Sequence, residues 1–268
     1  MSNFSIHVLA SGSKGNATLV QTGKQNFLID LGISCRELTQ KLKLCGLEPS
    51  QLEAVFITHE HSDHIKGMAT FMKKYAVPIY TSRETWKSVA LKLGGLKPEQ
   101  CLIIDQQLNL GEVAIISFQI PHDARDPHGY SFIRRDNQSK FTYLTDTGFI
   151  TDTVRKAADG CEVLVLECNH DIDMLKKGSY PYELKQRILS TQGHLSNTAA
   201  GYLLSQIKQL PQDVFLAHLS EENNTPALAL QTVSQQLETL GKLKKTKLYV
   251  ASQRNIISNA APAEEALF

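Results

Sequence analysis

One short stretch carries several side chains that could bind metal ions. Three histidines and an aspartate, His59, His61, Asp63 and His64, lie within six residues, directly after the apolar run A-V-F-I. In an extended segment, residues two apart point to the same side, so His59 and His61 can converge on one ion. At a turn into a following helix, Asp63 and His64 can face a second position. Imidazoles and carboxylates suit Zn²⁺, Mn²⁺ or Fe²⁺, so the stretch predicts a metal site.

Three further candidate ligands come at the ends of predicted strands, namely His122, Asp146 and His218. A sheet delivers such residues to its rim, where the sites of layered α/β proteins are built. Each of them taken alone would be an ordinary polar residue at a strand end. Together with the histidine stretch they predict a site for two metal ions.

The elements that must position these residues are short strands alternating with amphipathic helices. Runs rich in Val, Ile, Phe and Tyr predict strands, and apolar residues at helical spacing predict helices. The predicted strands cover 4–9, 17–21, 26–30, 54–58, 77–81, 113–120, 130–134, 141–145, 163–167, 214–218 and 247–251. The predicted helices cover 35–45, 65–75, 84–93, 151–158, 182–190, 197–209 and 226–240. This order indicates an α/β fold of sheets covered by helices.

Composition and charge set limits on the class of protein. The chain has 268 residues, 42% of them hydrophobic and 21% charged, which is typical of globular proteins. We expect one domain over 1–257 and a flexible tail over 258–268. With 28 Lys and Arg against 27 Asp and Glu, the net charge is +1, so any polyanion must be bound by a local basic patch. Basic doublets begin at Lys73, Arg134, Lys176 and Lys244, but they are scattered.

The sequence also indicates where the protein works. It contains no apolar run of the roughly 20 residues that a membrane helix needs, and its start does not resemble a signal peptide. Its five cysteines are widely spaced and form no CxxC pair, which favours reduced thiols over a disulfide framework. We therefore expect a cytoplasmic protein that has no membrane partner.

The ordered motifs resemble the metallo-β-lactamase fold superfamily. The pattern is H-x-H-x-D-H from His59, then His122, Asp146 and His218, with Asp30 ending an earlier apolar run. The resemblance implies a four-layer αββα sandwich of two mixed sheets flanked by helices. It also implies that His59, His61 and His122 hold one metal, that Asp63, His64 and His218 hold the other, and that Asp146 bridges them. Asp30 would support the histidine stretch from behind, and Asp63 would orient a bridging hydroxide nucleophile or accept its proton.

Other residues are predicted to contact substrate. His194, in the stretch G-H-L-S-N before a predicted helix, resembles a superfamily histidine that contacts the scissile phosphate or protonates its leaving group, with Ser196 beside it. The alternative is an ordinary helix start, capped by Ser196 or Asn197. A glycine-containing loop with Ser13, Lys14 and Asn16 could bind phosphate or could simply form a tight turn. Arg125, close to His122, could pair with a phosphate.

Several stretches together narrow the resemblance to the bacterial YycJ/WalJ (VicX) group. They are 11–16, 122–124, 166–171, 193–197 and 218–223, and Glu167 and His170 of the third stretch could also approach the site. That resemblance implies a divalent-metal-dependent 5′→3′ exonuclease that acts on double-stranded DNA in mismatch repair. The alternatives are a phosphodiesterase for small or cyclic nucleotides and a thioester or lactone hydrolase. A non-catalytic regulatory partner is a further alternative. Asp146 stands where true β-lactamases carry a cysteine, which argues against antibiotic hydrolysis.

The expected cofactors and partners follow from this resemblance. They are two divalent metal ions (Zn²⁺, Mn²⁺ or Fe²⁺), the ends of duplex DNA, and proteins of DNA repair. The acidic and apolar ending 264–268 faintly resembles a peptide that binds a sliding clamp, although most such tails have no partner. The sequence does not indicate the oligomeric state.

Overall fold

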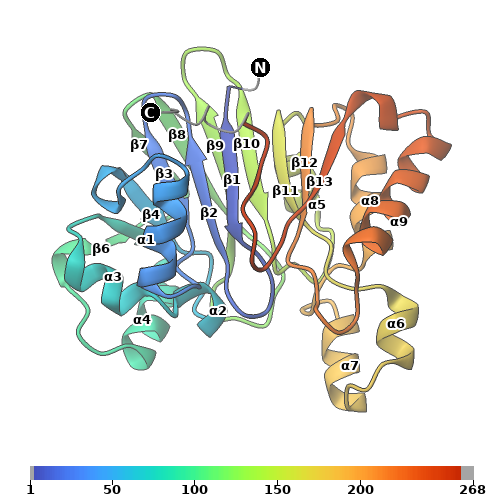
Figure 1. Cartoon of the computed structure of the whole chain (residues 1–268), viewed down its shortest axis with the longest axis horizontal. Helices are drawn as coiled ribbons and strands as arrows, with labels where there is room; N and C mark the ends of the chain where they lie inside the picture. The colour runs from blue at the N-terminus through green and yellow to red at the C-terminus, as the bar shows by residue number, and fades with distance from the viewer. Residues whose placement is uncertain (1–2, 261–268) are drawn as a thin grey trace, which may run out of the picture. The chain divides into compact units, whose positions relative to one another are not determined.

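Two mixed β-sheets, each flanked by helices, form the framework of the protein in a computed structural model that describes residues 3–260 (Figure 1). Each sheet has seven strands within this described part. Unit 1 contains the described residues up to Asp105 and from Ser252 onward, and unit 2 is Gln106–Ala251. The predicted α/β class is confirmed. That the two units form a single domain stays a prediction.

The sheet of unit 1 has the strand order β14-β1-β2-β3-β4-β5-β6. The first four strands in this order, β14 to β3, pair antiparallel, and β3 to β6 pair in parallel. The strands are β1 (Ser5–Ala10), β2 (Ala17–Gln21), β3 (Asn26–Ile29), β4 (Ala54–Phe56), β5 (Ile79–Thr81), β6 (Cys101–Ile103) and β14 (Ile257–Ser258). The helices are α1 (Cys35–Leu44), α2 (Ser62–Ile65), α3 (Met68–Lys74) and α4 (Arg83–Lys92), with 3₁₀ turns η1 (Pro49–Gln51) and η2 (Pro98–Gln100).

The sheet of unit 2 has the strand order β13-β12-β11-β10-β9-β8-β7. The strands are β7 (Gln107–Leu110), β8 (Val113–Gln119), β9 (His128–Arg134), β10 (Lys140–Leu144), β11 (Val163–Glu167), β12 (Asp213–Ala217) and β13 (Lys247–Val250). The helices are α5 (Asp152–Ala158), α6 (Ile172–Lys177), α7 (Tyr182–Leu189), α8 (Asn197–Gln206) and α9 (Pro226–Thr239), with a 3₁₀ turn η3 (Leu243–Lys245). Strands β10, β11, β12 and β13 are parallel, so their carboxyl ends lie along one edge of the sheet.

Helix α1 illustrates how the sequence forms these elements. The Ser34 hydroxyl accepts a hydrogen bond from the Glu37 backbone N–H and so caps the first turn. Lys41 and Lys43 lie in the last turn, where basic side chains complement the helix dipole. Leu38 and Leu42 are four residues apart and fully buried in the core of unit 1. The apolar side of α1 therefore packs onto the unit 1 core.

Three residues that end strands adopt a left-handed backbone that non-glycine residues rarely show. The φ angle is 65° at Asp30, 56° at Asp146 and 55° at His218. All three are residues that the sequence assigns to the candidate site. Such strain persists where the surrounding structure enforces it, which is characteristic of functional sites.

The helix predicted over 65–75 is interrupted, because its chain passes too close to a neighbouring segment. Gly67 separates α2 from α3, and its N–H donates to the Leu31 carbonyl oxygen at 2.7 Å. A Cβ atom on Gly67 would lie 2.1 Å from the Ile33 carbonyl oxygen, so no larger residue fits there. The short elements β6, β7, β14 and α6 were missed, because runs this short carry little periodicity.

The chain returns to unit 1 after β13, and this return segment is bonded there. Ser252 accepts a hydrogen bond from the Ser11 N–H, and the buried Lys41 ammonium donates to the Arg254 carbonyl oxygen at 2.8 Å. Strand β14 pairs with β1, and the Asn259 side chain bonds to the backbone of Ile6. Ser258 and Asn259 of the predicted flexible tail are therefore bonded to β1, while 261–268 lie outside the described residues.

Two further expectations concern membrane-spanning helices and the cysteines. Among residues 3–260, no helix combines the length and the apolar character that crossing a membrane requires. All five cysteines fall in this part and are free thiols, as the sequence predicted. Burial raises the pKa of Cys161 to about 12, so this thiol stays protonated and packs as a small apolar group.

Candidate metal centre

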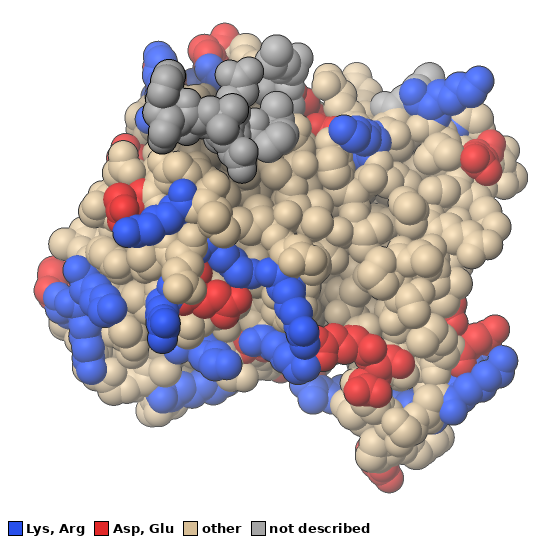
Figure 2. Space-filling view, viewed as in Figure 1, with Lys and Arg blue, Asp and Glu red and all other residues tan. Residues whose placement is uncertain are grey.

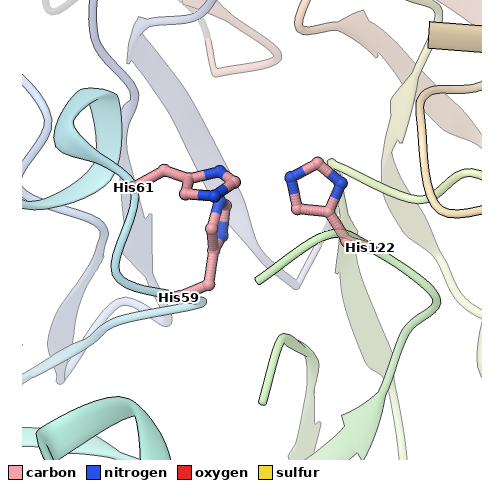
Figure 3. A group of neighbouring side chains, drawn as sticks. All are labelled: His59, His61 and His122. Carbon is pink, nitrogen blue, oxygen red and sulfur yellow. The ribbon is translucent and has the colours of Figure 1, made fainter. Parts of the chain in front are cut away.

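The histidine stretch of unit 1 forms the loop between β4 and α2. The rings of His59 and His61 lie edge to face with centroids 4.6 Å apart, so the two side chains converge as the alternation predicted. Figure 3 shows these two rings together on their loop, and His122 on the loop that follows β8. The His64 ring lies 4.1 Å from that of His59. Three imidazoles are thus gathered at the carboxyl end of β4.

Asp30 fixes this loop through hydrogen bonds to Thr58 and His64. It is fully buried, and one carboxylate oxygen accepts hydrogen bonds from the Thr58 N–H at 2.9 Å and the Thr58 hydroxyl at 3.0 Å. The other oxygen lies 2.8 Å from His64 Nδ1. Nδ1 therefore carries the proton, which leaves His64 Nε2 as the atom available to a metal. Burial raises the pKa of Asp30, and the attraction of His64 opposes that rise.

Replacement of Asp30 by alanine is expected to destabilise the protein by about 2–4 kcal/mol. The Thr58 N–H and His64 Nδ1–H would lose their acceptor while buried, and each orphaned group costs about 1–3 kcal/mol. Urea unfolding followed by circular dichroism measures the change. The exposed Asp105 is the matched control, and Asp105→Ala should shift stability by less than about 0.5 kcal/mol. Equal unfolding midpoints for the two variants would contradict this role of Asp30.

Asn16 positions the second half of the histidine stretch. Its buried amide nitrogen lies 3.2 Å from both Asp63 Oδ2 and His64 Nε2, and the Asn16 N–H donates to the Asp63 carbonyl oxygen at 2.8 Å. Gly32 approaches so closely that a Cβ atom on it would lie 1.6 Å from the Asp63 carbonyl oxygen. These bonds fix two candidate ligands, and the predicted contact of Asn16 with substrate stays a prediction.

Ser13 and Lys14, in the same loop, are exposed, whereas Asn16 is buried. The Lys14 N–H donates to Gln253 Oε1 at 3.0 Å. The Gln253 side chain in turn donates to the Gly15 carbonyl oxygen at 2.8 Å. The loop is therefore held by the returning C-terminal segment. Substrate contact by Ser13 or Lys14 stays a prediction.

In unit 2 the candidate ligands gather around Asp146. One of its carboxylate oxygens lies 3.3 Å from His218 Nδ1 and 3.8 Å from both His122 Nε2 and His194 Nδ1. Asp146, Glu167, His194 and His218 each offer a ligand atom within 4.8 Å of the others. Asp146 and His218 follow the parallel strands β10 and β12, which explains why residues so distant in sequence meet.

Glu167, which the sequence indicated only as a residue that could approach the site, lies beside two of the candidate residues. It ends the buried strand β11, and its Oε1 lies 2.7 Å from His194 Nδ1 and 3.2 Å from His218 Nδ1. Its Oε2 accepts from the Thr147 and Leu195 N–H groups. Burial raises the pKa of Glu167, but the attraction of His194 and the hydrogen bonds of His194 and His218 outweigh burial and hold this pKa at about 2. A carboxylate that ends an otherwise apolar strand was the signal available in the sequence.

Glu167, rather than a helix terminus, holds His194. Helix α8 begins at Asn197, and its cap is Ser196, whose hydroxyl accepts from the Ala199 N–H at 3.1 Å. Burial lowers the pKa of His194, but the carboxylates of Glu167 and Asp146 raise it above its ordinary value overall. His194 is therefore an oriented imidazole whose Nδ1 faces a carboxylate, so a proton on Nε2 is available for transfer.

The loop after β8 places His122 and Arg125 differently. His122 Nδ1 lies 3.2 Å from the Gly193 carbonyl oxygen, which orients the ring, and His122 Nε2 lies 3.3 Å from Asp123 Oδ1. Asp123 forms an ion pair with Arg187 of α7. Arg125 is exposed, and its predicted pairing with phosphate stays a prediction. The Asp123–Arg187 pair was not visible in the sequence, because 64 positions separate the two residues.

These donor sets suit divalent metal ions. Each unit presents buried imidazoles beside carboxylates, the combination that Zn²⁺, Mn²⁺ and Fe²⁺ accept. Second partners fix the ring orientation of His64, His122 and His218, as is usual for histidines that bind metals. The chain therefore carries a His/Asp cluster that is able to hold metal ions.

The comparisons with known proteins agree with this chemistry. Residues 25–219 match the beta-lactamase superfamily domain. The chain belongs to that superfamily, whose fold implies bound divalent metal ions.

Two curated relatives cover most of the chain. Exodeoxyribonuclease YycJ of Bacillus anthracis is 37% identical over 237 residues, which cover 87% of this chain and 89% of the relative. Exodeoxyribonuclease WalJ of Streptococcus pneumoniae is also 37% identical, with 87% of this chain and 88% of the relative covered. The resemblance to the YycJ/WalJ group is therefore confirmed.

Solved structures show the same fold. The metallo-β-lactamase fold protein YhfI of Bacillus subtilis aligns with a TM-score of 0.69 at 17% identity, covering 96% of this chain and 99% of that one. A diphosphatase of the PhnP family aligns with a TM-score of 0.65 at 16% identity, covering 95% and 97%. At these identities the structures support the fold alone.

Proposed function

We propose that this protein is a metal-dependent 5′→3′ exonuclease that hydrolyses double-stranded DNA. The observation that carries the proposal is its 37% identity to two exodeoxyribonucleases over 87% of the chain. Every candidate metal ligand lies inside the matched superfamily domain, 25–219. Two compact clusters of buried imidazoles and carboxylates add the chemistry that phosphodiester hydrolysis needs.

The proposed ligand sets are those implied by family membership. His59, His61 and His122 would hold one divalent ion, Asp63, His64 and His218 the other, and Asp146 both. Bound there, Zn²⁺, Mn²⁺ or Fe²⁺ would lower the pKa of water and screen the charge of the phosphodiester. The buried hydrogen bonds of Asp30 to His64 and of Glu167 to His218 would keep these imidazole rings oriented toward the metal ions.

The remaining steps belong to side chains of the chain itself. Asp63, fixed by Asn16, would accept the proton of the attacking water. His194, held at Nδ1 by Glu167, would donate its Nε2 proton to the departing 3′ oxygen of the released terminal nucleotide, and the phosphate would stay on the 5′ end of the shortened strand. The products would be a nucleoside 5′-monophosphate and a shortened strand.

The surface of unit 1 supports binding to a polyanion. Apart from the buried Lys41, helices α1, α3 and α4 together carry seven basic residues and two acidic ones. Figure 2 shows Lys and Arg side chains spread over the part of the surface that these helices form. A local patch of this kind can attract DNA although the whole chain is nearly neutral. Binding should then weaken steeply with added salt.

The direct test is degradation of blunt duplex DNA by the purified protein. With Mn²⁺ or Zn²⁺ present, we expect stepwise loss of a 5′ label as mononucleotide and its abolition by EDTA. A duplex with a 3′ label should shorten into a ladder while the label is retained. No shortening with any divalent ion tested, or release of a 3′ label first, would overturn the proposal.

A parallel assay separates the alternative substrates. Cyclic nucleotides, a thioester and a lactone, offered at equal concentration, should be hydrolysed with a kcat/KM far below that for duplex DNA. A preference for one of these compounds would reassign the same site to a small-molecule hydrolase.

We also propose the cellular setting. A duplex exonuclease of this kind would act in DNA repair in the cytoplasm and meet other repair proteins there. The suggested clamp-binding ending, 264–268, lies outside the described residues, and its deletion followed by a clamp-binding measurement would test it. The oligomeric state stays open.

A further inference from the structure

A cavity of about 510 Å³ opens on unit 2 between the loop after β10 and helix α8. Gly148, Phe149 and Arg155 line one side, and Leu195, Tyr202 and Gln206 line the other. Its volume falls within the roughly 300–1,000 Å³ of pockets that bind small molecules. It is thus large enough for part of a ligand to enter.

Two aromatic side chains in this cavity are more than half exposed. Phe149 is 53% exposed and Tyr202 is 55% exposed, whereas Tyr130, Phe132 and Phe141 of the same unit are fully buried. Exposed aromatic rings on a cavity wall provide faces on which nucleobases stack. Leu195, an aliphatic side chain of the lining, is only 3% exposed.

The rim of the cavity is polar and includes a cation. Thr151, Asp152 and Gln206 offer donors and acceptors to the edge of a base. The Arg155 guanidinium pairs with Asp152 at 2.9 Å and remains 39% exposed, so it can also contact a phosphate. The cavity therefore combines what a nucleotide presents, namely a flat apolar base, polar base edges and a negative charge.

Two residues of the cavity wall are close in sequence to candidate site residues. Phe149 comes three residues after Asp146, and three residues of chain span at most about 11 Å. Leu195, on the opposite wall, directly follows His194. A base held here would belong to a nucleotide close to the bond that is cut.

We propose that this cavity binds a nucleobase of the strand being degraded, stacked on Phe149 and Tyr202. The proposal rests on the proposed exonuclease function and adds that the enzyme grips an unpaired base near the scissile phosphate. Every base can stack on an aromatic ring, so such a site would bind the DNA strand without sequence preference.

The test compares normal substrates with substrates that carry an abasic site at each of the first three positions from the end. For the wild type, we expect KM to rise about 5- to 100-fold when the stacked base is missing. In Phe149→Ala and Tyr202→Ala this ratio should fall towards one, because no stacking remains to be lost. Phe149→Trp should preserve the ratio. Tyr182→Ala, which removes a 72% exposed tyrosine on α7 outside the cavity, should leave wild-type kinetics.

The same ratios are measured by fluorescence anisotropy with EDTA present, so that binding is read without cleavage. A wild-type ratio of one at all three positions, or a ratio unchanged in both alanine variants, would overturn the base-binding cavity. If the wild type cleaves no DNA with any metal, the exonuclease function fails, and the anisotropy ratios still decide the cavity.

Discussion

Replacement of Asp146 by alanine is expected to lower kcat for DNA hydrolysis by about 10³-fold or more. The carboxylate is the proposed ligand shared by both ions and lies at the centre of the unit 2 cluster. Stabilisation that a bound metal gives to developing charge is worth several kcal/mol, and each 1.36 kcal/mol is a factor of ten. Initial rates on duplex DNA with Mn²⁺ measure the loss.

Two measurements make this prediction specific to the site. Metal content after dialysis should fall in Asp146→Ala, while circular dichroism should still show the secondary structure of the wild type. Asp136, an exposed aspartate that pairs with Arg134, is the matched control, and Asp136→Ala should keep full activity and metal. Full activity of Asp146→Ala, with contaminating nuclease excluded, would refute the mechanism.

Replacement of Glu167 by glutamine is expected to lower kcat by about 10²- to 10⁴-fold, with a smaller change in KM. A general acid contributes a factor of this size, and His194 loses the carboxylate that orients its ring and raises its pKa. His194 must be protonated to act as an acid, so the rate falls as the pH rises through its pKa. In Glu167→Gln that pKa drops, and the alkaline limb of the pH–rate profile should move to lower pH.

The control for this variant is Glu183→Gln, an exposed glutamate of α7. It should keep both the wild-type kcat and the wild-type profile. A purely structural role for Glu167 would lower the amount of active enzyme without moving the pH profile. An unchanged alkaline limb in Glu167→Gln would therefore remove His194 from the role of acid.

The sequence predicted much of this fold, because hydrophobic periodicity and strand ends are local signals. The run A-V-F-I before His59 and the run V-L-V-L before Glu167 both form buried strands. Gly67 shows the limit of such signals, because the break between α2 and α3 depends on Leu31 and Ile33, which lie more than 30 positions earlier. A local pattern cannot register that approach.

The sequence predicted the candidate metal ligands, but not the hydrogen bonds that connect them to other side chains. Spacing indicated that His59 and His61 converge, and their ring geometry confirms it. Other contacts join segments that are distant in the sequence, so residue spacing does not reveal them. Asn16 bonds to Asp63, and Glu167 bonds to both His194 and His218. The buried carboxylate of Glu167 was the least predictable of these, because an acid on a fully buried strand contradicts ordinary burial preferences.

The return of the C-terminal segment to unit 1 has a consequence for synthesis of the protein on the ribosome. Strand β14, and the bonds from Ser252 and Gln253 to the loop that carries Asn16, become available only after all of unit 2 has been translated. Unit 2 can assemble its sheet from consecutive residues, whereas unit 1 waits for its edge strand. A nascent chain would therefore lack the hydrogen bonds behind Asn16 until the segment after β13 has been translated, which delays nuclease competence to that point.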